Sequence, residues 1–209
     1  MKRIITMLAT WVLLVSMGAT SALFAQNSKK NLIVYFSLYG NQKSVLTDVD
    51  TSASRTLYNG KVLGNTETIA QMIQDEVGGD MVLIETENKF SNGYHAVLKE
   101  GKHTKNTKFK ATKTNIDLSK YDSVFIGFPA WWYDMPDPLF DFLDKHDLSG
   151  KNVYVFATSG GSGLMRSISE IQKLEPKASV NKNGFHVYYT SVASAKGDVV
   201  KWLKNVGAK

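Results

Sequence analysis

Cysteine is absent from all 209 residues of the chain. This absence excludes disulfides, thiolate metal sites and lipid attachment at a cysteine. Histidine is scarce as well, and no two of the four histidines have the spacing of metal ligands, so we expect no metal site. Asp48 and Asp50 offer two carboxylates without further ligands beside them, which is too few for a calcium site. The stability of the fold must therefore come from a hydrophobic core.

A strong excess of either charge is also lacking. The chain has 25 basic and 19 acidic residues, which gives a net charge of +6. Its densest basic run covers 99–113, where the lysines meet Glu100 as the single acidic residue. Such a run is typical of a solvated face, and the alternative is a docking patch for an acidic partner or an anionic surface. No known nucleic-acid motif accompanies it, so we expect no nucleic-acid partner.

The first 25 residues carry the most apolar stretch of the chain. Lys2 and Arg3 are followed by a largely apolar run and then by small residues up to Ala25. This layout predicts a signal peptide over 1–25 and an exported protein, periplasmic or secreted. The apolar core of about 14 residues is short for a bilayer span of about 20, although an uncleaved anchor is the alternative. We expect no stable membrane insertion after cleavage and one domain over 26–209.

Uniformly apolar runs alternate with amphipathic segments along this domain, which predicts an α/β fold with a parallel sheet covered on both faces. Asn65 is the expected N-cap of the first helix, and Gly78 and Gly79 end it. The predicted strands cover 31–36, 81–85, 124–128, 153–157 and 185–189, and the predicted helices cover 66–77, 92–102, 137–145, 162–174 and 193–206.

A long segment, 38–63, separates the first strand from the first helix. The pair Gly40-Asn41 could open a helix, but the residues after it lack a 3.6-residue apolar period. A tight turn is expected at 58–61, which reads Tyr-Asn-Gly-Lys. Connections of this length are usually functional or disordered, so we expect a partly ordered lid beside whatever binds at Ser37.

Unusual residues follow the carboxyl ends of three predicted strands, and ligands of open parallel sheets bind at that edge. The first strand leads to Ser37 and, beyond the long segment, to Gly64, Asn65 and Thr66, where hydroxyls and a helix N-terminus suit a phosphate. The third strand leads to an aromatic loop that suits a flat ring: Pro129, Ala130, Trp131, Trp132 and Tyr133.

The fourth strand leads to a loop rich in glycine and hydroxyls, whose backbone N–H groups can face a ligand closely: Thr158, Ser159, Gly160, Gly161, Ser162 and Gly163. A phosphate cradle, an aromatic wall and an edge rich in donors together suit a planar heteroaromatic ring with a phosphorylated tail. Flavin mononucleotide (FMN) fits that description best.

These segments resemble the flavodoxin-like proteins. The similarity extends over 31–206 and is carried by 32–37, 64–66, 121–132 and 158–163. It implies a three-layer sandwich with a five-stranded parallel sheet in the order 2-1-3-4-5, helices on both faces, and non-covalent FMN. The phosphate would bind at Ser37, Asn65 and Thr66, and residues 129–133 and 158–163 would flank the isoalloxazine ring. The segment 38–63 resembles an insertion that splits the phosphate loop.

The chain departs from that family pattern in two ways. Flavodoxins are commonly acidic, whereas this chain is basic, which leaves its partner open. In many flavodoxins an aromatic residue of the third loop covers the outer face of the flavin. Here that loop offers Ser162, Gly163 and Leu164, so we expect one face to be open.

The resulting hypothesis is an exported FMN protein that passes electrons to a redox protein or to a small aromatic or quinone acceptor, without a catalytic residue of its own. One alternative is an NAD(P)H-dependent quinone or aromatic reductase, and another is a flavodoxin-fold binding module without cofactor. A hydrolase is not favoured, because Ser159 and Ser162 have no evident His partner in sequence. His186 is expected to be a half-buried residue of the last strand.

Overall fold

The computed structural model describes residues 30–43, 55–102, 109–112 and 116–209. Within them, short strands alternate with helices as the apolar pattern predicts. The strands are β1 Asn31–Tyr35, β2 Arg55–Tyr58, β3 Lys61–Gly64, β4 Asp80–Leu83, β5 Ser123–Pro129, β6 Asn152–Ser159, β7 Ser179–Val180 and β8 Phe185–Tyr188. The α-helices are α1 Asn65–Val77, α2 Tyr94–Glu100, α3 Asp137–Lys145, α4 Ser167–Leu174 and α5 Lys196–Asn205, and the 3-10 turns are η1 Tyr39–Asn41, η3 Leu118–Lys120 and η4 Tyr189–Ser194.

The main sheet is parallel throughout, with β1 paired to β4 on one side and to β5 on the other. β5 pairs in turn with β6, and the fifth position beside β6 is shared by two short strands. β7 pairs with the start of β6 and β8 with its end, because residues 182–184 leave the sheet in a turn where the Asn183 N–H binds the side chain of Asn181. The predicted order 2-1-3-4-5 is confirmed, with its last strand divided.

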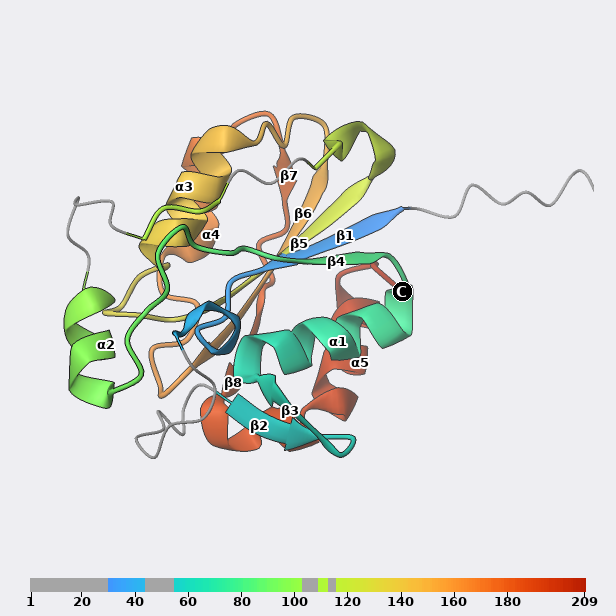
Figure 1. Ribbon diagram of the computed structural model, residues 1–209. Helices are drawn as coiled ribbons and strands as arrows, with labels where there is room; N and C mark the ends of the chain where they lie inside the picture. The colour runs from blue at the N-terminus through green and yellow to red at the C-terminus, as the bar shows by residue number, and fades with distance from the viewer. Residues whose placement is uncertain (1–29, 44–54, 103–108, 113–115) are drawn as a thin grey trace, which may run out of the picture.

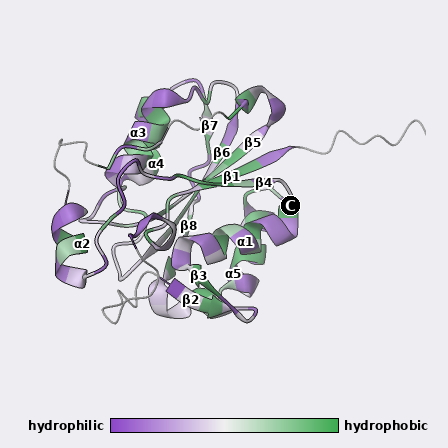
Figure 2. Cartoon of the chain, viewed as in Figure 1, coloured by the Kyte–Doolittle hydropathy of each residue, from purple (hydrophilic) through white to green (hydrophobic). Residues whose placement is uncertain are grey.

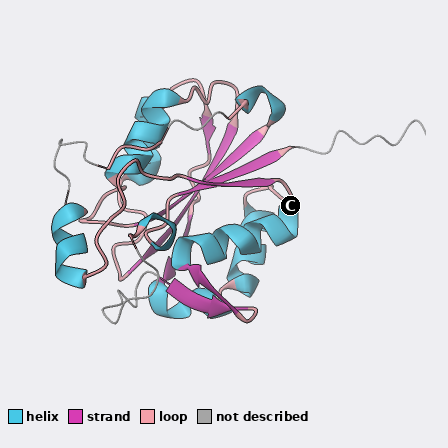
Figure 3. Ribbon diagram, in the orientation of Figure 1, coloured by secondary structure: helices cyan, strands magenta, loops and turns pink. Residues whose placement is uncertain are grey.

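Helices cover both faces of this sheet, as Figures 1 and 3 show. Alternate residues of β1 enter different cores: Leu32 and Val34 pack with α3 and α4, whereas Ile33 packs with α1 and α5. Side chains of a strand alternate between the faces, so a strand buried on both faces must be apolar throughout. Figure 2 shows that the helices α1 and α3 each carry hydrophobic and hydrophilic residues together, as helices with one buried face do.

Among the boundaries that differ from the prediction, two lie at the future site. The strand predicted to end at 157 continues through Ser159, so Thr158 and Ser159 are buried strand residues. The helix predicted from 162 begins only at Ser167, because Gly163 and Met165 have φ of 65° and 52°. Left-handed residues cannot belong to a right-handed helix. The turn between strand and helix is therefore longer than predicted.

The described part of 38–63 contains the η1 turn and a β2–β3 hairpin. Asn59 and Gly60 both have positive φ, as in a type I′ turn, which confirms the tight turn at 58–61. The hairpin packs against α1 and η4, with Tyr58 beside the core of that face. The predicted lid remains a prediction, since residues 44–54 lie outside the described part of the chain.

Asn41 fastens the start of the same segment to the sheet. Its buried amide donates to the backbone oxygens of Ser37 and Ile84, both at 2.9 Å, and its Oδ1 accepts from the N–H of Thr86 at 2.8 Å. One side chain thus satisfies backbone groups of two neighbouring strand ends, which would otherwise be buried without partners. These hydrogen bonds of Asn41 hold the peptide of Ser37 in place.

No helix among the described residues is long and apolar enough to cross a bilayer. The signal peptide predicted over 1–25 lies outside those residues and stays a prediction. Residues 103–108 and 113 of the basic run 99–113 lie outside them as well.

A glycine on β5 lies where two neighbouring strands pack closely in the core. A Cβ on Gly127 would overlap the Phe156 ring of the neighbouring strand. We expect Gly127→Ala to lower the free energy of unfolding by about 1–3 kcal/mol, because an overpacked core must shift its rings or strands. Gly197→Ala is the matched control: a Cβ there meets nothing within 4 Å in α5, so stability should stay or rise by about 0.5–1 kcal/mol. Urea denaturation of both variants measures this, and equal stabilities would contradict the packing argument.

Candidate functional site

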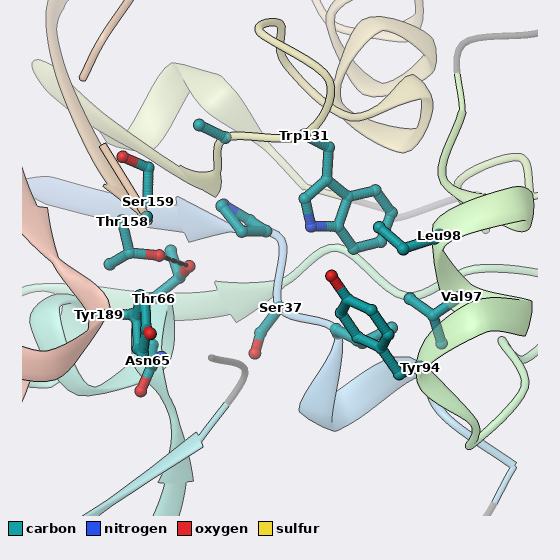
Figure 4. A pocket seen from close by; sticks show the side chains of 14 residues that line it. Ser37, Asn65, Thr66, Tyr94, Val97, Leu98, Trp131, Thr158, Ser159 and Tyr189 are labelled. Carbon is teal, nitrogen blue, oxygen red and sulfur yellow. Dashed lines mark hydrogen bonds between the residues drawn. The ribbon is translucent and has the colours of Figure 1, made fainter. Parts of the chain in front are cut away.

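A pocket of about 160 Å³ opens at the carboxyl ends of β1, β5 and β6. Figure 4 shows a polar group of side chains on one side of it and an aromatic and aliphatic group on the other. The predicted site residues that line it are Ser37, Asn65, Thr66, Pro129, Ala130, Trp131, Thr158, Ser159 and Gly160. Leu38, Tyr94, Val97, Leu98 and Tyr189 line it without having been predicted.

The polar wall is built where β1 and β6 meet the N-terminus of α1. Ser37, Thr66 and Thr158 are each 2% exposed, and the hydroxyls of Thr66 and Thr158 lie 3.0 Å apart in a hydrogen bond. This bond joins the first turn of α1 to the end of β6. The first N–H groups of a helix have no partner within it, so the wall combines hydroxyls with exposed backbone donors.

Gly64 is the N-cap of α1, the position expected for Asn65. It does not line the pocket, but a Cβ on it would overlap the Ser37 hydroxyl. Only glycine lets the serine approach the helix N-terminus so closely. The Gly64 N–H donates to the Glu67 carboxylate at 2.9 Å. Burial of the Tyr35 phenol on β1 raises its pKa, and the nearby Glu67 carboxylate raises it further.

Trp131 forms the centre of the apolar wall. Its ring lies edge-on to Phe36 and to Phe90, with centroids 5.4 Å apart in both pairs. Val97 and Leu98 of α2 complete this wall beside it. Edge-to-face contacts of this kind hold an indole in one orientation, so the wall is preformed.

The next two aromatic residues, Trp132 and Tyr133, lie outside the pocket. Both have left-handed backbone, with φ of 50° and 63°, at the tip of a turn closed by mutual hydrogen bonds of 3.0 and 2.8 Å between Trp131 and Asp134. This turn reverses the chain and leaves Trp132 50% and Tyr133 77% exposed. Trp132 instead donates its indole N–H to the Leu98 oxygen at 3.1 Å.

The glycine loop contributes Gly160 to the pocket, whereas Gly161, Ser162 and Gly163 lie outside its lining. Arg166 connects this loop to the aromatic one, because its guanidinium binds the buried Asp134 carboxylate at 3.0 Å. The carboxylate raises the pKa of Arg166, so the guanidinium stays charged across the physiological range. The two loops that flank the pocket are thus tied together.

Two tyrosines and a histidine were missed by the sequence reasoning. Tyr94, at the start of α2, and Tyr189, just after β8, line the pocket from opposite sides. They supply aromatic rings that residues 162–164 lack, and the open ligand face stays a prediction. The sequence contained a signal for Tyr189, because this residue ends a predicted strand at the edge of the sheet where ligands bind. It contained no such signal for Tyr94.

His186 is half-buried in the last strand, as expected, but it also has a partner that sequence spacing does not reveal. Its Nε2 lies 2.8 Å from the Ser159 hydroxyl, across the pairing of β6 with β8. The pair forms through strand pairing, at a separation of 27 residues.

A family model described as Flavodoxin matches residues 30–206. The chain belongs to the flavodoxin family. It is 30% identical over 104 residues to Flavodoxin 1 of Escherichia coli K12, an alignment covering 48% of this chain and 46% of that protein. The chain thus spans about half the length of this relative. A flavodoxin of Synechocystis sp. PCC 6803 is 25% identical over 158 residues, which cover 71% of this chain and 77% of the relative.

Solved structures share the flavodoxin fold with this chain. A protein described as a flavoprotein from Bacteroides eggerthii has a TM-score of 0.61 at 24% identity, covering 86% of this chain and 99% of its own. A second from Bacteroides uniformis has a TM-score of 0.62 at 23% identity, covering 85% and 99%. At these identities the likeness establishes the fold.

The hydroxyl pair of the polar wall can be tested without ligand. We expect Thr66→Val and Thr158→Val each to cost about 1–3 kcal/mol of unfolding free energy, because each leaves the other buried hydroxyl without this bond. The double variant should lose clearly less than the sum of the two, since no hydroxyl is then stranded. Urea denaturation of the three variants measures the coupling. Additive losses would show that the two hydroxyls do not interact.

Proposed function

We propose that this pocket binds FMN and that the protein carries electrons through the flavin. The observation that supports this most is the meeting of two unlike walls in one pocket of a flavodoxin-family chain. Hydroxyls and a helix N-terminus suit a phosphate, and a fixed indole beside a tyrosine suits a flat ring. A single ligand that needs both is a phosphorylated ring system.

The donor set of the polar wall fits a phosphate group. Ser37 and Thr66 are neutral hydroxyl donors, and the first N–H groups of α1 add donors at the positive end of the helix dipole. The acidic residue of this turn, Glu67, already accepts from the Gly64 N–H. In the proposal Ser37, Asn65 and Thr66 hold the phosphate.

The apolar wall would take the ring. Trp131 and Tyr94 offer flat faces, and Gly160 brings backbone close to the edge of the pocket. FMN itself supplies the one- and two-electron chemistry when it is bound. The task of the chain is then to orient the ring, to exclude water from it and to leave one edge within reach of a partner. No side chain needs to act as an acid or a base in this proposal.

The phosphate assignment is tested by comparing FMN with riboflavin. We expect the wild-type protein to form a yellow complex with FMN at micromolar concentration. The double variant Ser37→Ala/Thr66→Val should bind FMN at least tenfold more weakly, since each lost bond to a charged phosphate is worth about 1.5–3 kcal/mol. Fluorescence titration measures both affinities.

Riboflavin lacks the phosphate, so its affinity should be the same in the wild type and in the double variant. An equal loss for riboflavin would mean that the substitutions damage the pocket in general. A wild-type protein that stays colourless with FMN would overturn the proposed function.

The partner is proposed to be acidic. Two exposed residues of the pocket mouth, Tyr94 and Leu98, lie on α2, and Lys99 and Lys102 lie on or just beyond this helix. The Lys102 ammonium is 5.8 Å from the exposed Trp132 ring. A basic rim around an apolar mouth attracts anionic partners and steers their approach.

Two small electron acceptors of opposite charge test the steering. We expect the photoreduced FMN protein to react faster with ferricyanide as salt is lowered, and more slowly with hexaammineruthenium(III), because the basic rim attracts one and repels the other. Lys99→Gln/Lys102→Gln should reduce both salt effects. Stopped-flow absorbance under anaerobic conditions measures the rates. Identical salt effects for the two acceptors would contradict the acidic-partner proposal, and rapid bleaching by NADPH alone would favour a reductase instead.

A further inference from the structure

The Ser159 hydroxyl, at the end of β6, has three partners. It accepts from the N–H of Gly161 at 3.0 Å and from the N–H of Gly163 at 3.3 Å, and it lies 2.8 Å from the Nε2 of His186. Ser159 is 7% exposed and also lines the pocket. One oxygen atom therefore joins the glycine loop, β8 and the site.

The hydrogen bonds of this oxygen point to one protonation state of the histidine. A serine hydroxyl has two lone pairs and one hydrogen. The two glycine N–H groups are donors and use the two lone pairs, so the hydroxyl hydrogen must point to Nε2 of His186. Nε2 is then an acceptor, and the imidazole is neutral with its hydrogen on Nδ1.

The surroundings of His186 favour this neutral form. Burial lowers the pKa of the imidazole below its ordinary value of 6.5. On the same strand, the titratable neighbour of His186 is Tyr188, and the centroids of the two rings are 6.0 Å apart. Arg166 lies just beyond the glycine loop, and its guanidinium is paired with Asp134 at 3.0 Å and lies 4.0 Å from Glu170.

Protonation would break this arrangement. A second hydrogen on the imidazole sits on Nε2 and points at the Ser159 oxygen, where both lone pairs are already used. Either the hydroxyl hydrogen must turn away and displace a glycine N–H, or the histidine must move. In each case a hydrogen bond that holds Gly161 or Gly163 is lost.

We propose that His186 is a positioning residue: through the Ser159 hydroxyl it latches the glycine loop beside the pocket, and its protonation releases the latch. Gly161 and Gly163 have φ of 135° and 65°. Glycine adopts positive and negative φ about equally readily, so its own backbone preference does not keep the loop in this conformation and hydrogen bonds must do so. Ligand affinity then falls as the pH drops through the pKa of His186. This last consequence rests on the proposed FMN function, whereas the latch itself does not.

The latch is tested first without flavin. In ¹⁵N NMR spectra of the full protein near pH 7.5, we expect the unprotonated shift for Nε2 of His186 and the protonated shift for Nδ1. The amides of Gly161 and Gly163 should titrate together with the imidazole below about pH 6.5. A hydrogen on Nε2 at neutral pH, or glycine amides that do not follow the histidine, would overturn the latch.

The consequence for the pocket is tested with FMN and two variants. His186→Gln places an amide oxygen near the position of Nε2, where it accepts from Ser159 at every pH, and His186→Leu removes the acceptor. From about pH 7.5 to about pH 5 we expect wild-type FMN affinity to fall about three- to tenfold more than that of His186→Gln, which corresponds to one lost hydrogen bond. His186→Leu should be weaker than His186→Gln at pH 7.5.

The FMN phosphate itself titrates near pH 6, but its proposed donors Ser37, Asn65 and Thr66 are unchanged in His186→Gln, so the difference between wild type and this variant isolates the latch. His146→Gln, at the end of α3, is the matched control and should keep the wild-type pH profile. Equal profiles for wild type and His186→Gln would overturn the effect on the pocket. Failure to bind FMN at any pH would refute the proposed function and leave the NMR result to decide the latch.

Discussion

The burial of β1 on both faces is the constraint on which the rest of this structure depends. Every residue from Leu32 to Phe36 is at most 6% exposed, because β4 and β5 flank the strand and helices cover both of its sides. The middle of this strand, Leu32 to Val34, is apolar throughout, and the first serine hydroxyl follows where the strand ends. Ser37 is the first residue that can meet a ligand, and Asn41 ties its backbone to the neighbouring strand end. The position of the pocket follows from this strand.

The two walls of the pocket are held by different kinds of interaction. Packing fixes the apolar wall, where Trp131 is wedged between Phe36 and Phe90. Hydrogen bonds fix the polar wall, from the Thr66–Thr158 pair to the partners of Ser159. Ion pairing of Arg166 with Asp134 then joins the loops that carry both walls. A preformed site of this kind avoids ordering its own groups when a ligand binds.

Much of the site could be predicted because its residues adjoin apolar strands. Ser37, Thr66, Trp131 and Thr158 were found in this way, since the end of a buried parallel strand is the edge where ligands bind. The same reasoning could not separate Trp131 from Trp132 and Tyr133. Their difference lies in a two-residue turn of left-handed backbone, a conformation for which bulky aromatics give no sequence signal.

The sequence by itself determined the alternation of the five predicted strands and five helices along the chain, the parallel sheet and the strand ends at which a ligand would bind. These follow from the spacing of apolar residues, which is a local property of the chain. Only the tertiary structure decided that Tyr94 and Tyr189 face each other across the pocket and that Ser159 meets His186. Such contacts join residues far apart in sequence through strand pairing and helix placement, and no local pattern encodes which side chains then meet.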